Sequence, residues 1–200
     1  MSDFESHSQA AQDRFAYELC DFKPDGTFLD IGCHDGHTNS NSLALEEVGW
    51  RGLLVDIHMQ SGLAARASEF LIADATLADW PRIFELYFPD KKLIDYLSLD
   101  ADESTTAVLE KLVELPIRFR TITIEHDAYR LGSAAQDRQR ALLDGQGYDL
   151  VCSDVRIQAG EWHPTGGPFE DWWANPIKTN LEKRNRLRCH NRHWSVIMVP

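Results

Sequence analysis

Short apolar runs alternating with longer segments of helical periodicity constrain this chain more than any other feature. The runs have the length and β-branched content of buried strands, and the segments between them carry apolar residues three and four positions apart. We expect strands at residues 27–32, 52–56, 70–72, 94–99, 120–125, 148–152, 169–176 and 193–199. Such alternation is typical of βαβ units with right-handed crossovers. It predicts an α/β fold, a doubly wound and mostly parallel sheet with helices on both faces.

The helical segments between these runs are bounded by ordinary start and stop residues. We expect helices from about Thr38 after the first strand, and over 63–68, 78–88, 104–115 and 133–144. Pro81 fits the first turn of its helix, and residues 160–168 have the character of a loop or hairpin.

The length predicts one domain. With 200 residues and 43% hydrophobic content, the chain can bury one full core. Within it we distinguish a polar, helical N-terminal extension (1–25), a Rossmann-like domain (26–176) and a basic segment (177–200) that packs on the same domain.

Charge and cysteine spacing exclude several classes of function. The 32 acidic and 20 basic residues give a net charge of −12, which disfavours general binding to nucleic acid. No apolar run approaches the roughly 20 residues that span a bilayer, and the N-terminus does not resemble a signal peptide. The four cysteines form no CxxC pair, so we expect reduced thiols rather than a zinc site or a disulfide framework. These features predict a cytoplasmic protein without a membrane partner.

A glycine-containing loop follows the first expected strand. It reads Asp30-Ile-Gly-Cys-His-Asp-Gly36, a D-x-G-x-x-x-G spacing. Glycine lets the backbone turn sharply and approach a ligand closely. His34 stands where a dinucleotide fingerprint has its second glycine, which weakens an NAD interpretation. We count His34 with Asp30, Gly32 and Gly36 as cofactor-binding candidates.

Carboxylates also end the next two strands. Asp56 lies about 20 residues beyond the loop, where a carboxylate commonly accepts hydrogen bonds from ribose hydroxyls. Asp74 and Ala75 follow the third strand, in position to meet an adenine edge. Either aspartate alone is an ordinary turn residue, but together with the loop they indicate a nucleoside-bearing ligand.

Several blocks of the chain resemble the FkbM-type methyltransferases, a branch of the class I, S-adenosylmethionine-dependent fold. The blocks occur in the family's order and are residues 26–36, 40–46, 49–56, 94–100, 124–127 and 169–176. The resemblance implies that Asp30, Gly32 and Gly36 surround the methionine part of the cofactor and that Asp56 holds its ribose. The chain departs from the family's pattern at two places. Members often carry Glu at the position of Asp56, and many have Glu-Gly where this chain has Ala-Asp-Glu-Ser at 101–104.

The ends of the fourth and fifth strands carry the catalytic candidates. In one hypothesis His126 is the general base for an acceptor hydroxyl and Asp100 orients it. In another, Asp100 and Asp127 bind Mg²⁺ or a similar divalent cation through oxygen. In a third, these residues only form turns and caps.

Other residues have weaker functional signals. His34 and His37 flank the glycine loop, near an acceptor or simply at the surface. Trp162, Trp172 and Trp173 are either sugar-stacking or core residues, and consecutive Trp172 and Trp173 must face opposite sides of a strand. The basic residues of 178–192 form a solvated helix or meet an anionic acceptor or an acidic neighbouring subunit, as in a homo-oligomer.

The sequence thus favours S-adenosylmethionine-dependent O-methylation of a small hydroxylated acceptor, such as a sugar or a natural-product intermediate. Two alternatives stay open. One is a nicotinamide-dependent oxidoreductase, disfavoured by the missing glycine fingerprint. The other is a cofactor-binding protein without catalysis that serves in regulation or assembly.

Overall fold

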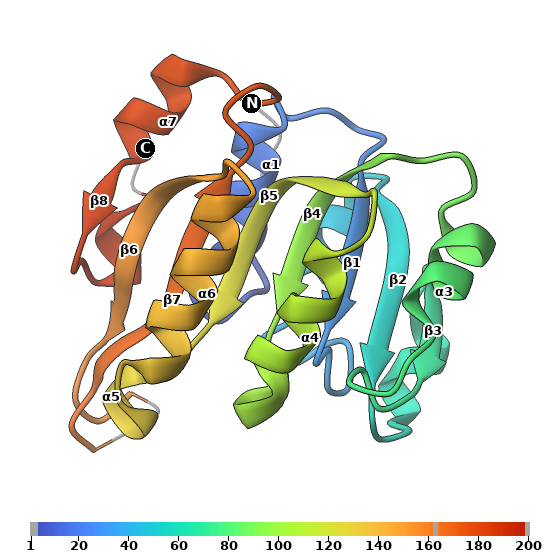
Figure 1. Cartoon of the computed structure of the whole chain (residues 1–200), viewed down its shortest axis with the longest axis horizontal. Coiled ribbons are helices and arrows are strands. Elements are labelled where there is room, and N and C mark those ends of the chain that lie inside the picture. Colours follow the sequence, from blue (N-terminus) through green and yellow to red (C-terminus); the bar gives the residue numbers. More distant parts are fainter. Residues whose placement is uncertain (1–3, 162–163, 199–200) are drawn as a thin grey trace.

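A single mixed sheet forms the centre of the protein. The computed structural model describes residues 4–161 and 164–198. These residues form an eight-stranded sheet in the order β3-β2-β1-β4-β5-β7-β6-β8 (Figure 1). The strands are β1 (Thr27–Ile31), β2 (Arg51–Asp56), β3 (Glu69–Ile72), β4 (Leu93–Leu99), β5 (Arg118–Glu125), β6 (Asp149–Ile157), β7 (Gly167–Ala174) and β8 (Cys189–His190).

The strand order reverses beside β1. This strand pairs in parallel with β2 on one side and β4 on the other, and the chain winds outward in both directions from there. In open parallel sheets such a reversal leaves a crevice beyond the carboxyl ends of the strands. The doubly wound α/β fold predicted from the sequence is confirmed.

β7 is antiparallel to its neighbours. It lies between β5 and β6 and pairs with both in the antiparallel sense. The expected strand 169–176 is therefore confirmed, two residues earlier along the chain. The expected hairpin at 160–168 joins β6 to β7, although residues 162 and 163, and with them the Trp162 interpretation, lie outside the described residues.

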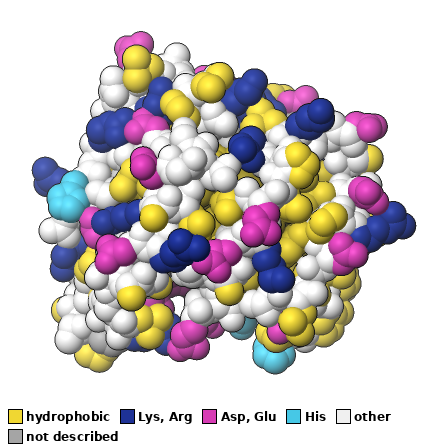
Figure 2. Space-filling model, in the orientation of Figure 1, with side chains coloured by type: hydrophobic (Ala, Val, Ile, Leu, Met, Phe, Trp, Pro, Cys, Tyr) yellow, Lys and Arg dark blue, Asp and Glu magenta, His cyan; other side chains and the backbone are white. Residues whose placement is uncertain are grey.

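Helices cover both faces of the sheet. The core cluster on one face includes residues of α3 (Trp80–Tyr87), α4 (Thr105–Val113) and α6 (Ala134–Gly145). The clusters on the other face include residues of α1 (Gln12–Leu19), α2 (Leu43–Glu47) and α7 (Leu181–Leu187). Figure 1 shows α4 and α6 in front of the sheet and α1 behind it. Charged side chains of both signs are interspersed over the α4–α6 face (Figure 2).

Helix α3 illustrates how the sequence specifies these elements. Asp79 caps its N-terminus by accepting a hydrogen bond from the backbone N–H of Arg82 at 3.2 Å. Pro81 occupies the first turn, where its missing N–H costs nothing. Ile83 and Phe84 are buried with Trp80 on one side of the helix, as period 3.6 requires.

The first crossover helix starts later than predicted. α2 begins at Leu43 rather than near Thr38. Asp35 accepts hydrogen bonds from the backbone N–H groups of His37 and Thr38 at 2.8 and 2.7 Å, so the local side chain holds a turn there instead of a helix. The helix expected at 63–68 is likewise a 3₁₀ turn, η1 (Ser61–Ala65). A short α-helix, α5 (Ala128–Leu131), and a 3₁₀ turn, η2 (Asp102–Ser104), follow β5 and β4.

The strand predicted at 193–199 is wrong for the residues that the structure describes. A 3₁₀ turn, η3 (Trp194–Val196), occupies that place, and the terminal strand is β8, only two residues long. His193 caps the turn through Nδ1, which accepts from the Ser195 N–H at 3.3 Å. This local cap outweighs the β-branched content that suggested a strand.

The two consecutive tryptophans belong to the core. Trp172 is fully buried in a cluster with Phe15 of α1, and Trp173 is buried in the cluster on the opposite face. Their placement on opposite faces is confirmed.

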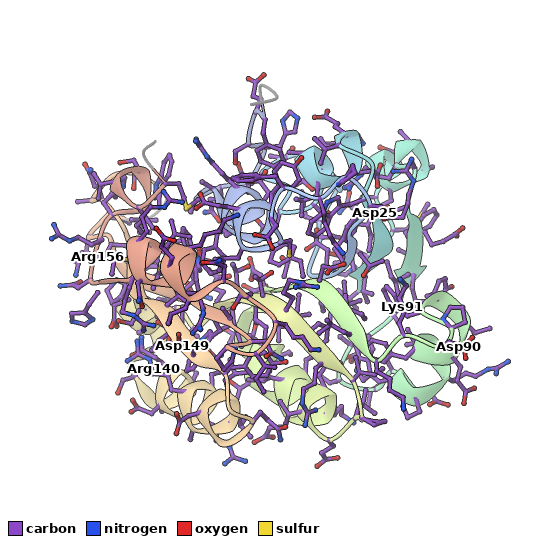
Figure 3. The ribbon with its side chains drawn as sticks, turned by 90° about the horizontal axis from the view of Figure 1, so that it is seen from above. Asp25, Asp90, Lys91, Arg140, Asp149 and Arg156 are labelled. Carbon is purple, nitrogen blue, oxygen red and sulfur yellow. The ribbon has the colours of Figure 1, made fainter. Side chains whose placement is uncertain are left out.

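The basic C-terminal segment pairs with acidic groups of this chain. Asp149 lies at the amino end of β6 (Figure 3). Its carboxylate binds both Arg184 and Arg188. Lys183 pairs with Asp21 at 2.9 Å, and Arg186 pairs with Glu18 of α1. These contacts dock the C-terminal segment on β6 and on the C-terminal end of α1. In the described part of the chain, no helix is both long and apolar enough to cross a membrane.

Candidate cofactor and active site

A cavity of about 660 Å³ lies beyond the carboxyl ends of β1, β2, β4 and β5. This volume is within the roughly 300–1,000 Å³ typical of small-molecule sites. Seven of the sequence candidates line it, namely Gly32, His34, Asp56, Asp74, Ala75, Asp100 and Asp127. A second cavity of about 270 Å³ adjoins it and is lined by Asp30 together with Gly32, His34 and Asp100.

Gly32 brings the ends of β1 and β4 into backbone contact. Its φ of +83° is in the region that favours glycine, and a Cβ there would lie 1.5 Å from the carbonyl oxygen of Asp100. The backbone N–H of Asp100 donates to the carbonyl of Ile31 at 3.0 Å, and that of Gly32 donates to the carbonyl of Val55 at 2.8 Å. No side chain fits between these strands, so Gly32 sets the floor of the cavity.

Asp56 ties the glycine loop to the end of β2. One carboxylate oxygen accepts from the backbone N–H of His34 and the other from that of His58, both at 2.8 Å. Each oxygen retains acceptor capacity for a further donor. The carboxylate lines the cavity, so the structure places Asp56 where it can bind a hydroxyl of a ligand.

Asp74 combines two roles that the sequence left as alternatives. Its side chain accepts from the Thr76 N–H at 2.8 Å and from the Thr76 hydroxyl at 2.6 Å, which makes a local turn. These hydrogen bonds lower the pKa of Asp74 below its ordinary value. The same turn lines the cavity with Ala75, so Asp74 is both a turn residue and a wall of the site.

Asp30 and Gly36 contribute less directly. Asp30 is buried, accepts from the Ser42 hydroxyl at 2.6 Å, and has a pKa raised by burial. Gly36 does not line either cavity. Its carbonyl accepts a hydrogen bond from Arg66 at 2.5 Å, and a Cβ on Gly36 would press on Leu63 and Arg66.

Arg66 is a residue that sequence reasoning missed. Its guanidinium is buried and pairs with Glu46 of α2 at 3.2 and 3.3 Å while it also donates to Gly36 and to the hydroxyls of Ser40 and Ser42. Burial alone would raise the pKa of Glu46, but hydrogen bonds from Ser68, Ala67 and Arg66 outweigh it and lower that pKa. One buried ion pair thus holds the glycine loop in place. The two residues are 20 positions apart and no local pattern connects them.

A pair of carboxyl groups lies at the ends of β4 and β5. Asp100 and Glu125 both line the cavity and are hydrogen-bonded to each other. Burial raises the pKa of Asp100, and burial together with the neighbouring Asp100 raises the pKa of Glu125 further. Two carboxyls in contact cannot both ionise readily, because the charge on one disfavours ionisation of the other. The sequence reasoning stopped at Asp100 and missed Glu125.

The carboxylate of Asp127 is bound by Arg130. Asp127 has a left-handed backbone with φ of 49°, and its Oδ2 accepts from Nε and Nη2 of Arg130 at 3.0 and 2.5 Å. Arg130 also approaches Asp102 of η2 at 3.6 Å, so it spans the mouth of the cavity. Among the described residues, no group of three or more His, Cys, Asp or Glu side chains is arranged to hold a metal ion. The predicted Mg²⁺ site has no support in this geometry.

His126 lies outside the cavity. Its buried ring accepts a hydrogen bond from the Ala128 N–H through Nδ1 at 3.1 Å, and Nε2 lies 2.9 Å from the Gln136 side chain and 3.6 Å from Asp171. Asp171 is itself buried and bound by Arg140 at 2.7 and 2.9 Å. The structure therefore does not bring His126 and Asp100 together as the base hypothesis requires. His126 instead supports the turn between β5 and α5.

Tyr129 also lines the cavity. It follows Asp127 on α5, and burial together with the neighbouring Asp127 raises its pKa to about 12. Of the flanking histidines, His34 lines the cavity with a largely exposed side chain, whereas His37 contacts the carbonyl of Gly62 at 3.1 Å on the surface.

The cavity is strongly acidic. Its described lining contains six carboxyl side chains and a single guanidinium, that of Arg130, and no lysine. The carboxyls are those of Asp56, Asp74, Asp100, Asp102, Glu125 and Asp127. A cavity of this charge attracts a cationic ligand and repels an anionic one.

Solved structures with the same fold include methyltransferases and a cyclase. Burkholderia thailandensis 1,6-didemethyltoxoflavin-N1-methyltransferase, crystallised with S-adenosylhomocysteine, matches with a TM-score of 0.51 at 14% identity, over 84% of this chain and 79% of that one. A Clostridium thermocellum structure assigned as an rRNA methylase matches with a TM-score of 0.51 at 13% sequence identity, over 85% of this chain and 96% of that one. The [4+2]-cyclase SpnF matches with a TM-score of 0.50 at 12% sequence identity, over 87% of this chain and 85% of that one.

These likenesses establish the fold. The chain has the class I methyltransferase architecture, a single α/β domain. No family model and no curated protein matches the chain, so membership of the FkbM-type family is not shown. The cyclase with this fold also means that architecture alone does not decide the reaction.

The contact at Gly32 yields a prediction. In G32A, the new Cβ must displace the Asp100 carbonyl and open the junction of β1 and β4, so we expect a loss of stability of several kcal/mol, beyond the ~1–2 kcal/mol that a left-handed non-glycine residue costs. The matched control is G147A, because Gly147 has a similar φ of +78° with no atom within 4 Å of its Cβ position. Urea unfolding of both variants measures the difference. Equal losses would contradict the close contact.

Proposed function

We propose that this protein is an S-adenosylmethionine-dependent methyltransferase. The observation that carries the proposal is the acidic cavity at the strand-order reversal, with Asp56 on one side and the Asp100–Glu125 pair on the other. The finer proposal, membership of the FkbM-type family, is supported by the ordered sequence blocks described above.

The charge of the cavity fits this cofactor. S-adenosylmethionine carries a sulfonium and an ammonium against one carboxylate, so it is a net cation, and six carboxyls surround the space it would fill. Gly32 and the smaller cavity beside Asp30 would accommodate the methionine part, and Asp56 would accept from the ribose hydroxyls. Asp74 and Ala75 would border the adenine. The cofactor supplies an activated methyl group, so the chain has only to bind, orient and deprotonate an acceptor.

The same charge disfavours a nicotinamide dinucleotide. Its pyrophosphate needs backbone N–H groups at a helix N-terminus or a basic side chain. Here α2 begins eleven residues after Gly32, and the backbone N–H groups of the loop are directed to Asp35 and Asp56. The oxidoreductase alternative therefore has no matching phosphate site in the described residues.

We assign the proton acceptor to Asp100, in place of His126. Asp100 lines both cavities, and the pKa of its partner Glu125 is raised further, so Asp100 is the first of the two to ionise and has a raised basicity. A carboxylate of this kind can take a proton from an acceptor hydroxyl as the methyl group is transferred. We propose a small hydroxylated acceptor that enters between Tyr129 and Arg130, which both line the cavity.

Ligand affinity tests the proposed function directly. We expect isothermal titration calorimetry to show binding of S-adenosylmethionine and S-adenosylhomocysteine and no binding of NAD⁺. Replacement of Asp56 by Asn should weaken both adenosyl ligands, since ribose hydroxyls then lose an anionic acceptor worth about 1.5–3 kcal/mol. Binding of NAD⁺ in preference to the adenosyl ligands would overturn the proposal. Binding without methyl transfer to any of a panel of hydroxylated acceptors would favour the non-catalytic alternative.

The carboxyl pair predicts a pH profile. Because the pKa of Asp100 is raised, activity should fall as the pH drops through a value above the ordinary ~4 of an aspartate, as Asp100 takes up a proton. D100N cannot accept a proton and should lose ~10²–10⁴-fold in kcat/KM, a much larger effect than its loss of cofactor affinity, because the five other carboxyls of the cavity remain. E125Q, whose amide still donates to Asp100, should lose far less. Full activity of D100N would exclude Asp100 as the base.

A further inference from the structure

Two cysteines lie directly opposite each other at the far edge of the sheet. β8 pairs with β6 in parallel, and Cys152 of β6 is in register with Cys189 of β8. Neighbouring strands are separated by about 4.8 Å, which is within the ~4.4–6.8 Å between Cα atoms that a disulfide spans. Both side chains belong to the same face, where Cys152 is part of the core cluster and Cys189 packs against it. This juxtaposition does not depend on the proposed cofactor site.

The two thiols differ in the way that a reactive pair requires. Cys189 is partly exposed, and contact with Cys152 together with nearby Arg192 lowers its pKa, so it has the greater thiolate character. Cys152 is fully buried, and burial and the neighbouring Cys189 raise its pKa well above the ordinary value. The partly exposed thiol of Cys189 is thus in contact with the buried thiol of Cys152.

The other two cysteines provide a contrast within the same chain. Cys20 and Cys33 are buried, and burial raises the pKa of each thiol. Cys20 caps the C-terminus of α1, outside the sheet that holds Cys152 and Cys189, and its thiol donates to the carbonyl of Asp95 at 3.8 Å. Neither of these thiols is expected to react with a mild oxidant.

We propose that Cys152 and Cys189 form a reversible disulfide site that locks the C-terminal segment onto the sheet. The oxidant is hydrogen peroxide. The Cys189 thiolate attacks the peroxide, an S–O bond forms, and the O–O bond breaks with release of hydroxide, which takes up a proton to give water. The Cys152 thiol then attacks the Cys189 sulfenic sulfur, the S–S bond forms, and the S–O bond breaks with release of a second water. Two thiols and one H₂O₂ therefore give one disulfide and two waters.

The local structure can adjust to the bond. β8 is an edge strand of two residues, and Asn191 directly after it has a left-handed backbone with φ of 54°. The thiol of Cys152 now donates to the carbonyl of Leu187 at 3.2 Å, a hydrogen bond that oxidation would replace by the covalent link. The closed loop would hold α7 and β8 against β6, where Arg184 and Arg188 already bind Asp149.

Thiol counting and peptide mapping test the site on the whole chain. After treatment with a small excess of H₂O₂ and removal of the oxidant, we expect two of the four thiols to titrate under denaturing conditions. The intact mass should fall by two hydrogen atoms, a cross-linked peptide should join Cys152 to Cys189, and dithiothreitol should restore all four thiols. Amide hydrogen exchange over residues 181–190 should slow in the oxidised form.

The variants separate this site from general oxidation. C189S should keep its remaining thiols under the same treatment, and C152S should accumulate oxygen on Cys189 without an internal cross-link. C33S is the matched control, and it should still form the cross-link. Retention of four titratable thiols in the wild type, or a cross-link through Cys20 or Cys33, would overturn the proposal. So would irreversible oxygen addition to Cys189 with Cys152 left reduced.

Discussion

The backbone contact between Gly32 and the carbonyl of Asp100 is the constraint on which the rest of this site depends. It brings the ends of β1 and β4 closer than any side chain would allow. The turn that follows directs the His34 N–H to Asp56 of β2, so three strands meet at one point. The buried Arg66–Glu46 pair then fixes the remainder of the loop from the opposite side. The cavity is the space these contacts leave beyond the strand ends.

Burial of carboxyl groups gives this cavity its chemical character. The pKa values of Asp100 and Glu125 are both raised, because the strands place the two carboxyls in contact away from bulk water. Arg130 pairs with Asp127 at the mouth and leaves the interior acidic. A binding site with this charge is suited to a sulfonium cation and poorly suited to a pyrophosphate. The fold is shared with a cyclase as well as with methyltransferases, so this chemistry, rather than the architecture, supports methyl transfer.

The sequence predicted the features that arise from local periodicity and strand ends. The parallel strands, the glycine loop and the aspartates at the carboxyl ends of β1, β2, β3 and β4 can be inferred because each depends on a few consecutive residues. Two element boundaries were predicted wrongly because a single side chain sets the local backbone. Asp35 holds a turn where a helix start was expected, and His193 caps a 3₁₀ turn where a terminal strand was expected. Glu125, Arg66 and the true surroundings of His126 depend on contacts between distant segments. Adjacent residues on β5 and its turn face opposite ways, so Glu125 lines the cavity while His126 packs toward Asp171.

A crystal structure of the chain grown with saturating S-adenosylhomocysteine tests the central claim most directly. We predict that the ligand occupies the cavity beyond β1 and β4, with its ribose hydroxyls on Asp56, its adenine beside Asp74 and Ala75, and its sulfur toward Asp100. An empty cavity at saturating ligand, or an adenosyl group bound elsewhere on the molecule, would contradict the account.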